Sequence, residues 1–168
     1  MNEQHLTLVL MRHAKSAYPD DVADHERPLA PRGIREAGLA GDWLRANVPT
    51  IDSVLCSTAT RTRETLTRTG IAAPVRYTQR LYGAGPGTVI EEINRVADDV
   101  NTLLVVGHEP TTSSVALILA GANGTEATAV QRISEKFPTS GVAVLRVPGR
   151  WADLEPGGAA LVAFHVPR

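Results

Sequence analysis

The chain is poor in several residue types, and each scarcity excludes a class of protein. Cys56 is the one cysteine among 168 residues, so the chain has no internal disulfide framework and no zinc site built from several cysteines. No apolar run reaches the ~18–20 residues that span a bilayer. The N-terminus is too short and too acidic for a signal peptide. We therefore expect a cytoplasmic protein that does not bind a membrane.

Charge and composition are those of an ordinary globular domain. The chain has 17 basic and 18 acidic residues and a net charge of -1, which gives no sign of nucleic-acid binding. Lysine occurs only at Lys15 and Lys136, so most basic residues are arginines, whose forked donors suit phosphate and carboxylate. With 43% hydrophobic and 21% charged residues, the chain is neither a coiled coil nor disordered. Its length predicts one domain over residues 1–168 and leaves the oligomeric state open.

Short apolar runs rich in β-branched residues alternate with segments of helical periodicity. Runs that are apolar on both faces are typical of buried parallel strands. The sequence predicts strands over residues 6–11, 52–56, 75–77, 102–106, 142–147 and 160–166. Helices are expected over residues 31–47, 60–69, 88–97 and 112–121. This order predicts a three-layer α/β/α fold whose central sheet is mostly parallel, with an antiparallel C-terminal edge.

Three segments that follow predicted strands contain residues suited to phosphate chemistry. Arg12 and His13 follow the first strand, Ser57 and Arg61 follow the second, and His108 follows the strand over residues 102–106. Ligands of an open parallel sheet bind beyond the carboxyl ends of its strands, so these side chains should lie together. The arginines offer bidentate donors for a phosphate-sized anion, and the start of the 60–69 helix adds backbone donors. A neutral imidazole in such a ring can act as a nucleophile on phosphorus.

Other chemistries lack their sequence patterns. The chain has no GxxxxGK[ST] nucleotide loop, no GxSxG elbow of a serine hydrolase and no HExxH zinc helix. His13 and His108 could bind a metal ion together with a carboxylate of the segment 20–24. The neighbouring arginines disfavour a cation there, so we expect no metal. His25, in the acidic segment 20–26, is expected to be solvated.

These residues resemble the motifs of the histidine phosphatase superfamily, which has the phosphoglycerate-mutase-like fold. Arg12-His13-Ala14 is similar to its Arg-His-Gly signature, with alanine in place of the glycine. Ser57-x-x-x-Arg61 followed by Thr65 resembles the second motif, and residues 106–108, Val-Gly-His, resemble the third. Further segments resemble the short bacterial branch typified by the phosphohistidine phosphatase SixA, namely residues 12–16, 27–29, 32–33, 81–82, 107–110 and 137–139.

The resemblance implies a role for each residue of the site. His13 would be the nucleophile and would be phosphorylated transiently. Arg12 and Arg61 would bind the phosphoryl oxygens, and His108 would complete the pocket and stabilise charge in the transition state. Two further donors to the substrate are expected, Ser16 and Ser57. The superfamily uses neither a metal nor an organic cofactor, and the implied partner is a phosphate-bearing substrate such as a histidine-phosphorylated protein.

The sequence departs from larger members of the superfamily at the general acid. Those members place a Glu or Asp after the third strand, where it protonates an alkoxide leaving group. Residues 81–85 contain no carboxylate here, and loss of a general acid could cost ~10²–10⁴-fold on an ordinary phosphomonoester. The imidazole of a phosphohistidine leaves readily once protonated, so the departure favours a P–N bond. The carboxylates that could still reach the site are Glu91, Glu92, Glu109, Asp20 and Asp24.

Three functions remain open from the sequence. The first is a cofactor-independent phosphatase of phosphohistidine in a protein, and the second is a phosphatase of a small phosphorylated metabolite by the same mechanism. The third is a non-catalytic module that recognises phosphate, against which the pair His13 and His108 argues, because a pure binder needs no nucleophile. A short chain has little length for a lid, and an open site favours hydrolysis over a mutase reaction. Residues 122–136 form either a surface loop or a wall that selects the substrate.

Overall fold

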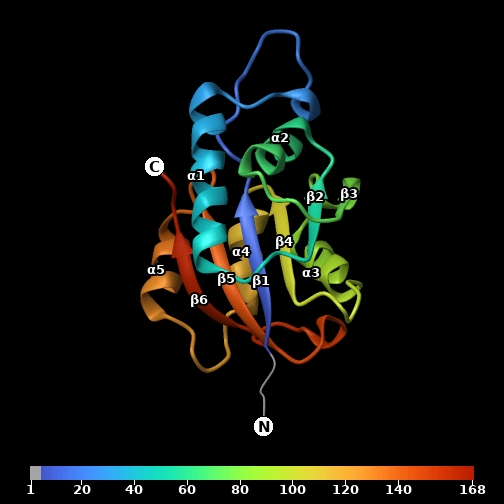
Figure 1. Cartoon of the computed structure of the whole chain (residues 1–168), viewed down its shortest axis with the longest axis vertical. Coiled ribbons are helices and arrows are strands. Elements are labelled where there is room, and N and C mark those ends of the chain that lie inside the picture. Colours follow the sequence, from blue (N-terminus) through green and yellow to red (C-terminus); the bar gives the residue numbers. More distant parts are fainter. Residues whose placement is uncertain (1–4) are drawn as a thin grey trace.

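A single sheet runs through the centre of the molecule. The computed structural model describes residues 5–168, and within them six strands have the order β3-β2-β4-β1-β5-β6 (Figure 1). The strands are β1 (His5–Arg12), β2 (Ser53–Ser57), β3 (Val75–Thr78), β4 (Thr102–Gly107), β5 (Val142–Pro148) and β6 (Ala160–His165). The helices are α1 (Pro31–Asn47), α2 (Thr60–Thr69), α3 (Pro86–Asn94), α4 (Thr111–Leu119) and α5 (Ala127–Glu135).

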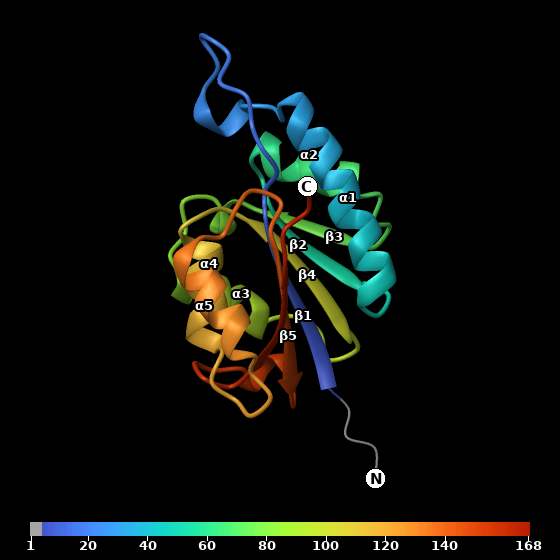
Figure 2. The same cartoon turned by 90° about the vertical axis from the view of Figure 1, so that its left-hand side faces the viewer.

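The first four strands are parallel, and the C-terminal strands form an antiparallel edge. β1 pairs in parallel with β4, and β2 pairs in parallel with both β4 and β3. β5 is antiparallel to β1 and to β6. Helices α1 and α2 cover one face of the sheet, and α3, α4 and α5 cover the other (Figure 2). The three-layer α/β fold predicted from the sequence is therefore confirmed.

The central strands are apolar on both sides because helices cover both faces of the sheet. In β1, Leu8 and Leu10 belong to the core cluster that includes residues of α3, α4 and α5. Val9 and Met11, which alternate with them, belong to the cluster that includes residues of α1 and α2. All four side chains are at most 1% exposed. A strand buried in this way needs a nearly continuous apolar run, which is the pattern of residues 6–11.

Helix ends follow the local sequence, although two helices differ from the expected bounds: α3, and α4, which spans Thr111–Leu119 where the sequence predicted residues 112–121. Pro31 and Pro86 each stand in the first turn of a helix, where the missing N–H group of proline costs nothing. Helix α3 therefore begins at Pro86 and ends at Asn94, whereas the sequence predicted a helix over residues 88–97. Gly70 follows the last turn of α2 with a φ of 73°, the left-handed conformation that glycine adopts without strain.

Residues 122–136 contain helix α5, which packs on the sheet. Ala129 and Ile133 of α5 are buried in the core cluster. The Arg132 guanidinium lies 4.8 Å from the Phe164 ring of β6, and its Nη1 donates to the Phe164 carbonyl oxygen at 2.9 Å. The segment is therefore a packed helix rather than a loose surface loop, and it leads directly into Lys136.

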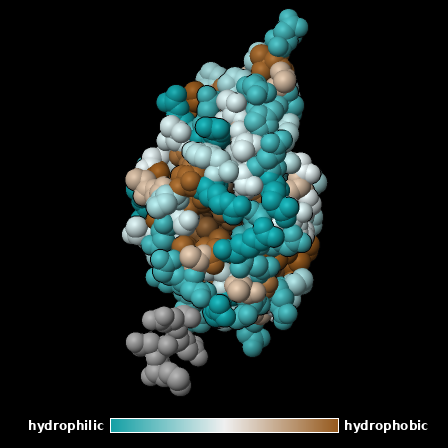
Figure 3. Space-filling view, turned by 90° about the vertical axis from the view of Figure 1, so that its right-hand side faces the viewer, coloured by the Kyte–Doolittle hydropathy of each residue, from teal (hydrophilic) through white to brown (hydrophobic). Residues whose placement is uncertain are grey.

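The segment between β1 and α1 extends beyond the sheet at its carboxyl edge (Figures 1 and 2), and its tip is hydrophilic (Figure 3). An isolated antiparallel bridge joins Ser16 to Leu29 at the base of this segment. The Ala17 amide also donates to the Pro28 carbonyl oxygen at 2.8 Å. These bonds hold the two ends of the segment together next to the carboxyl ends of the strands.

Helices α1 and α2 approach closely at Gly41, which generates a stability prediction. A Cβ atom at Gly41 would lie within 3.0 Å of backbone atoms of Thr69, whereas at Gly38 the nearest atom is the Arg68 carbonyl oxygen at 3.8 Å. We predict that Gly41→Ala lowers the free energy of unfolding by about 1–3 kcal/mol because of overpacking. The matched variant Gly38→Ala should leave it unchanged or raise it by up to about 1 kcal/mol, since alanine is the better helix former. Urea unfolding measures both, and equal effects would contradict the close approach.

Candidate active site

Four basic side chains from three segments meet at the carboxyl edge of the sheet. Arg12 ends β1 and His13 follows it, Arg61 lies in the first turn of α2, and His108 follows β4. The imidazole rings of His13 and His108 have their centroids 5.4 Å apart. The charges of Arg12 and Arg61 both act on each imidazole. The structure thus brings together the four residues that the sequence placed beyond the strand ends.

Hydrogen bonding orients His13, which is 7% exposed. Its Nδ1 lies 2.7 Å from the Ala14 carbonyl oxygen. A carbonyl oxygen only accepts hydrogen bonds, so Nδ1 has the hydrogen and Nε2 keeps an unshared electron pair. The Ala14 amide in turn donates to Thr65 Oγ1 at 2.9 Å, and this hydroxyl donates to the Arg61 carbonyl oxygen at 2.6 Å. Thr65 therefore ties the segment after β1 to the first turn of α2.

The hydroxyl of Ser57 holds His108 in place. Ser57 Oγ lies 2.8 Å from His108 Nε2 and also accepts from the Ala59 amide at 3.3 Å. Ser57 is fully buried. The structure therefore brings Ser57 into contact with one of the four residues, and its hydroxyl is occupied by that contact.

Ser16 has a different neighbour. Its buried hydroxyl accepts from Arg27 Nη1 at 2.7 Å, and the same guanidinium donates to the Ala17 carbonyl oxygen at 3.1 Å. Within residues 5–168, Ser16 Oγ forms no hydrogen bond with the four site residues. Arg27 therefore fastens the base of the projecting segment, and the hydroxyl of Ser16 contributes to that structure.

The guanidinium of Arg61 is hydrogen-bonded to Asp24. Arg61 Nη1 donates to the Asp24 carbonyl oxygen at 2.8 Å, and Nη2 donates to Asp24 Oδ2 at 3.1 Å. The Tyr82 hydroxyl donates to the same Oδ2 at 2.6 Å, and Arg27 Nε donates to Oδ1 at 3.1 Å. The projecting segment therefore reaches back to the site, where Asp24 binds Arg61 through both its carboxylate and its backbone carbonyl oxygen.

Tyr82 and His25 complete the rim of the site. The Tyr82 ring meets the rings of His108 and His25 edge-on, with centroid distances of 5.6 and 4.8 Å. The sequence predicted that His25 is solvated. In the structure its Nε2 instead lies 2.8 Å from Thr58 Oγ1, so His25 packs at the rim of the site. Sequence reasoning did not assign Tyr82 to the site. The signal that could have found it is its position just after β3, at the same edge of the sheet.

Burial keeps both imidazoles of the site neutral. It lowers the pKa of His13 to about 3 and the pKa of His108 to about 4, from an ordinary value of 6.5. The positive charges of Arg12 and Arg61 contribute to both of these pKa shifts in the same direction as burial. The Asp24 carboxyl, in contrast, is ionised. Hydrogen bonds from Tyr82 and Arg27 and the charge of Arg61 hold its pKa well below its usual range.

Of the other carboxylates that the sequence offered as acids, Asp20 is exposed, and Glu91, Glu92 and Glu109 have hydrogen-bond partners outside the four site residues. Arg80 binds both Glu91 and Glu92, at 3.0 and 2.9 Å, beside α3. Glu109 accepts from the Ser113 amide at 2.6 Å in the first turn of α4. Burial lowers the pKa of Arg12, and the negative charge of Glu109 opposes that shift. Asp24 is therefore the carboxylate that contacts the site directly, and it is ionised.

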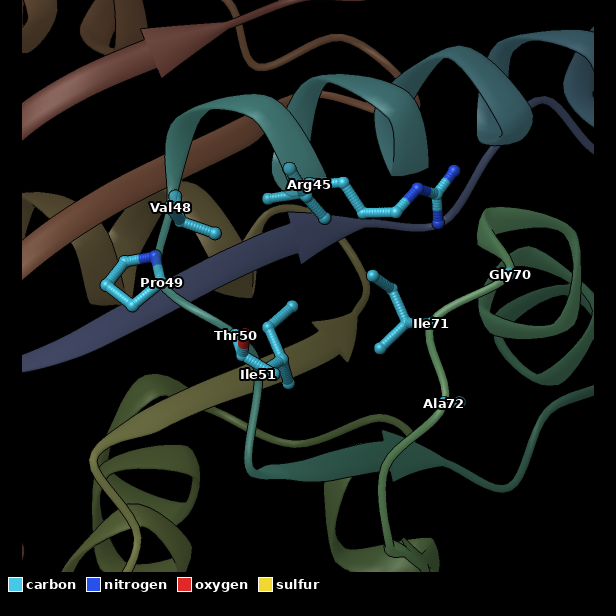
Figure 4. Close-up of a pocket in the computed structure, with 9 residues that line it drawn as sticks. Arg45, Val48, Pro49, Thr50, Ile51, Gly70, Ile71 and Ala72 are labelled. Carbon is cyan, nitrogen blue, oxygen red and sulfur yellow. The ribbon is translucent and has the colours of Figure 1, made fainter.

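A hollow of about 340 Å³ lies at the end of the strands opposite to the site (Figure 4). Its walls come from the end of α1, the segment before β2 and the segment after α2, and include Leu44, Ile51 and Ile71. Arg45 and Thr50 line it as well, but its lining contains no histidine, cysteine or carboxylate that could act as a general acid or base.

Residues 5–168 contain neither a cluster of metal ligands nor a membrane-spanning helix. No three His, Cys, Asp or Glu side chains in that range lie close enough together to hold a metal ion. None of the helices described there is both long and apolar enough to cross a bilayer.

Comparisons with known proteins identify a family and several similar proteins. Residues 8–87 match the profile of the histidine phosphatase superfamily (branch 1). An uncharacterized protein of Mycobacterium tuberculosis is 76% identical over 158 residues, which cover 94% of this chain and 100% of that protein. An uncharacterized protein of Mycobacterium leprae is 66% identical over 162 residues, with coverage of 94% and 100%. The structure of a proposed phosphohistidine phosphatase SixA from Nakamurella multipartitia is 43% identical, with a TM-score of 0.89 and coverage of 97% and 96%.

The chain belongs to the histidine phosphatase superfamily, and it is a phosphatase. Within that superfamily it is of the SixA type. The resemblance inferred from the sequence motifs is thereby confirmed.

The depressed pKa values generate a prediction for stability against pH. Both imidazoles titrate lower in the folded state than in the unfolded state, so the unfolded chain binds more protons between pH 6.5 and about 4. The free energy of unfolding should therefore fall as the pH is lowered through this window, by about 1.4 kcal/mol per pH unit for each proton taken up. Urea unfolding at a series of pH values should give a shallower slope for His13→Gln, and a still shallower one for His13→Gln/His108→Gln. An unchanged slope in both variants would contradict the burial of neutral imidazoles.

Proposed function

We propose that this phosphatase hydrolyses phosphohistidine in a protein through a covalent intermediate on His13. The proposed substrate class rests on the protonation state of Asp24. Asp24, which contacts the site directly, is held ionised by Tyr82, Arg27 and Arg61 and has no proton to donate. An alkoxide leaving group needs such a proton. An imidazole leaves from phosphorus without help from a protein acid once its other nitrogen is protonated.

His13 is the nucleophile of the proposed mechanism. Its Nε2 electron pair forms a new bond to phosphorus while the P–N bond of the substrate breaks, and the leaving imidazole takes the two electrons of the broken bond. Water then attacks the phosphorus of phospho-His13, which releases inorganic phosphate and returns the electron pair to Nε2. The hydrogen bond from Nδ1 to the Ala14 carbonyl oxygen supports this assignment, because it aims the unprotonated nitrogen away from the backbone. The low pKa of His13 keeps the nucleophile unprotonated throughout the neutral range.

Arg12, Arg61 and His108 bind the transferring phosphoryl group. Arg12 Nε, Arg61 Nε and His108 Nδ1 are buried, and none of them has a hydrogen-bond partner within residues 5–168. Buried donors without acceptors are costly, and a phosphoryl group supplies several acceptor oxygens. Ser57 supports His108 by donating to its Nε2, which leaves the hydrogen on Nδ1 to donate to the phosphoryl group. Ser57 is then a positioning residue, and it does not contact the substrate.

The substrate must displace Asp24 from Arg61. The Asp24 carboxylate accepts from the guanidinium that the phosphoryl oxygens need, so both anions cannot occupy it together. The projecting segment is held at its base by Arg27, while its acidic turn, Asp24–Glu26, contacts the site. Asp24 therefore acts as a stand-in anion that neutralises Arg61 until the phosphoryl group arrives. The proposed SixA phosphohistidine phosphatase that is 43% identical to this chain supports the same substrate class.

The nucleophile is tested by rapid-quench labelling with radiolabelled phosphoramidate in metal-free buffer. The intact protein should form an acid-labile, base-stable phosphoprotein, because a P–N bond has these properties. His13→Ala should form none. The matched variant His165→Gln should keep the label, since the ring of His165 stacks on Trp43 at 4.6 Å rather than on the site. Labelling that persists in His13→Ala would overturn the assignment.

The substrate class is tested by comparing kcat/KM for phosphoramidate and for an alkyl phosphate. We expect a preference for phosphoramidate of at least ~10²-fold, which is the lower range of what a missing general acid costs. Equal values, or a preference for the alkyl phosphate, would favour a small phosphorylated metabolite as the substrate instead.

The competition at Arg61 is tested with Asp24→Asn. Removing the negative charge should make inorganic phosphate a tighter competitive inhibitor by about tenfold, the order expected for one hydrogen bond to a charged group. Asp20→Asn, which removes the same charge from an exposed position of the same segment, should change the inhibition constant little. A weaker inhibition in Asp24→Asn would show that Asp24 assists phosphate binding instead of competing with it.

A further inference from the structure

A basic groove adjoins the site on the side of Arg12. It is a hollow of about 210 Å³ whose charged lining is Arg12, Lys15, Arg32, Lys136 and Arg168. These residues come from the end of β1, the segment after it, the first turn of α1, the residue after α5 and the C-terminal segment. Both lysines of the chain are among them. The concentration is unusual for a protein whose net charge is -1.

The walls of the groove are held in a fixed relation. A Cβ atom on Gly33 would lie within 3.0 Å of Lys15 backbone atoms, so the first turn of α1 packs directly on that segment. The Ala30 amide also donates to the Lys15 carbonyl oxygen at 2.9 Å. On the other wall, Arg12 Nη1 donates to the Phe137 carbonyl oxygen at 3.0 Å. Backbone packing therefore holds the segments that line the groove, and the cations on them, close together.

The positive charge of the groove is only partly compensated, since Glu36 pairs with two of its five cations and the negative charge of Glu109 acts on a third, Arg12. Glu36, which is 1% exposed, lies 3.7 Å from Arg32 Nε and 3.4 Å from Arg168 Nη1. Among residues 5–168, no ion pair is formed by the other three cations, which are Arg12, Lys15 and Lys136. Like charges held together repel one another, and an anion from outside relieves that repulsion. The groove is thus suited to a negatively charged ligand.

Arg12 joins the groove to the phosphoryl site. Its side chain lines the groove, and its charge also acts on both His13 and His108. We infer that the groove binds acidic side chains that flank the phosphohistidine on the substrate protein. This inference rests on the proposed function, and it adds the sequence preference of the substrate.

The groove fits carboxylates of a polypeptide better than the second phosphate of a small molecule. Arg32 and Arg168 each have side chains that are 53% exposed, and Lys136 is exposed as well. A lysine ammonium on a flexible stem pairs with carboxylates in many geometries, whereas a single phosphate is held best by converging arginine forks. Cations spread over several segments therefore match several carboxylates on an extended chain.

Two phosphohistidine peptides of equal length test the inference. One has Asp and Glu on both sides of the phosphohistidine, and the other has Asn and Gln at the same positions. For the intact protein at low salt we expect kcat/KM to be about three- to tenfold higher for the acidic peptide, and the difference to shrink at high salt. Phosphoramidate, which has no flanking residues, reports the basal activity of each variant.

The variants Lys136→Gln and Arg32→Gln/Lys136→Gln should lose this preference and keep the rate on phosphoramidate. The single variant guards against misfolding, since Lys136 is exposed. Arg68→Gln is the matched control, because it removes one positive charge from the far end of α2, and it should keep the full preference.

Each outcome separates the inference from the proposed function. Equal turnover of both peptides by the intact protein would overturn the groove and leave phosphohistidine as the substrate. A preference for the acidic peptide that persists in Arg32→Gln/Lys136→Gln would also overturn the inference about the groove. The intact protein could also turn over a small bisphosphate faster than either peptide, and Arg32→Gln/Lys136→Gln could lose that activity. This result would identify the ligand of the groove as a phosphorylated metabolite instead of a peptide. Turnover of an alkyl phosphate but of neither peptide would overturn the proposed function itself.

Discussion

The parallel register of β1 against β4 determines where the two histidines of the site lie relative to each other. Arg12 pairs with Gly107 in this register, and the His13 amide donates to the Gly107 carbonyl oxygen at 3.0 Å. His13 and His108 therefore leave the sheet side by side, which explains the 5.4 Å between their rings. β2 pairs with the other edge of β4 and ends at Ser57, within hydrogen-bonding distance of His108. A slip of one residue in this pairing would turn alternate side chains to the other face of the sheet and separate the histidines.

The site combines burial with positive charge, and the two effects act in the same direction on the imidazoles. Both remove the proton from His13 and His108 at neutral pH, which suits a nucleophile. The same positive charge needs an anion for compensation. In the structure that anion is Asp24, which contacts Arg61 from a segment that projects beyond the sheet. The arginines thus have a partner before the substrate binds, and binding exchanges one anion for another.

Arg12 connects two regions that accept negative charge. On one side it approaches the histidines, and on the other it lines the groove that holds both lysines of the chain. The turn after α5 lines that groove with Pro138 and Thr139. It is joined to β1 by two hydrogen bonds of 3.1 Å, from the Arg12 amide to the Gly141 carbonyl oxygen and from the Ser140 amide to the His13 carbonyl oxygen. A phosphatase of this size can therefore combine the chemistry and the recognition of flanking residues on one edge of one sheet.

The sequence by itself determined the features that depend on neighbours in the chain. Continuous apolar runs identified β1 and β4, because a strand covered on both faces has no polar side. The motif residues Arg12, His13, Arg61 and His108 could be assigned to one edge, because they follow parallel strands. Only the tertiary structure decided the contacts of Asp24 and Tyr82, which are 58 residues apart, and the meeting of Lys15 with Lys136. Such contacts depend on how loops pack over long distances in the chain, and no local pattern of residues encodes that packing.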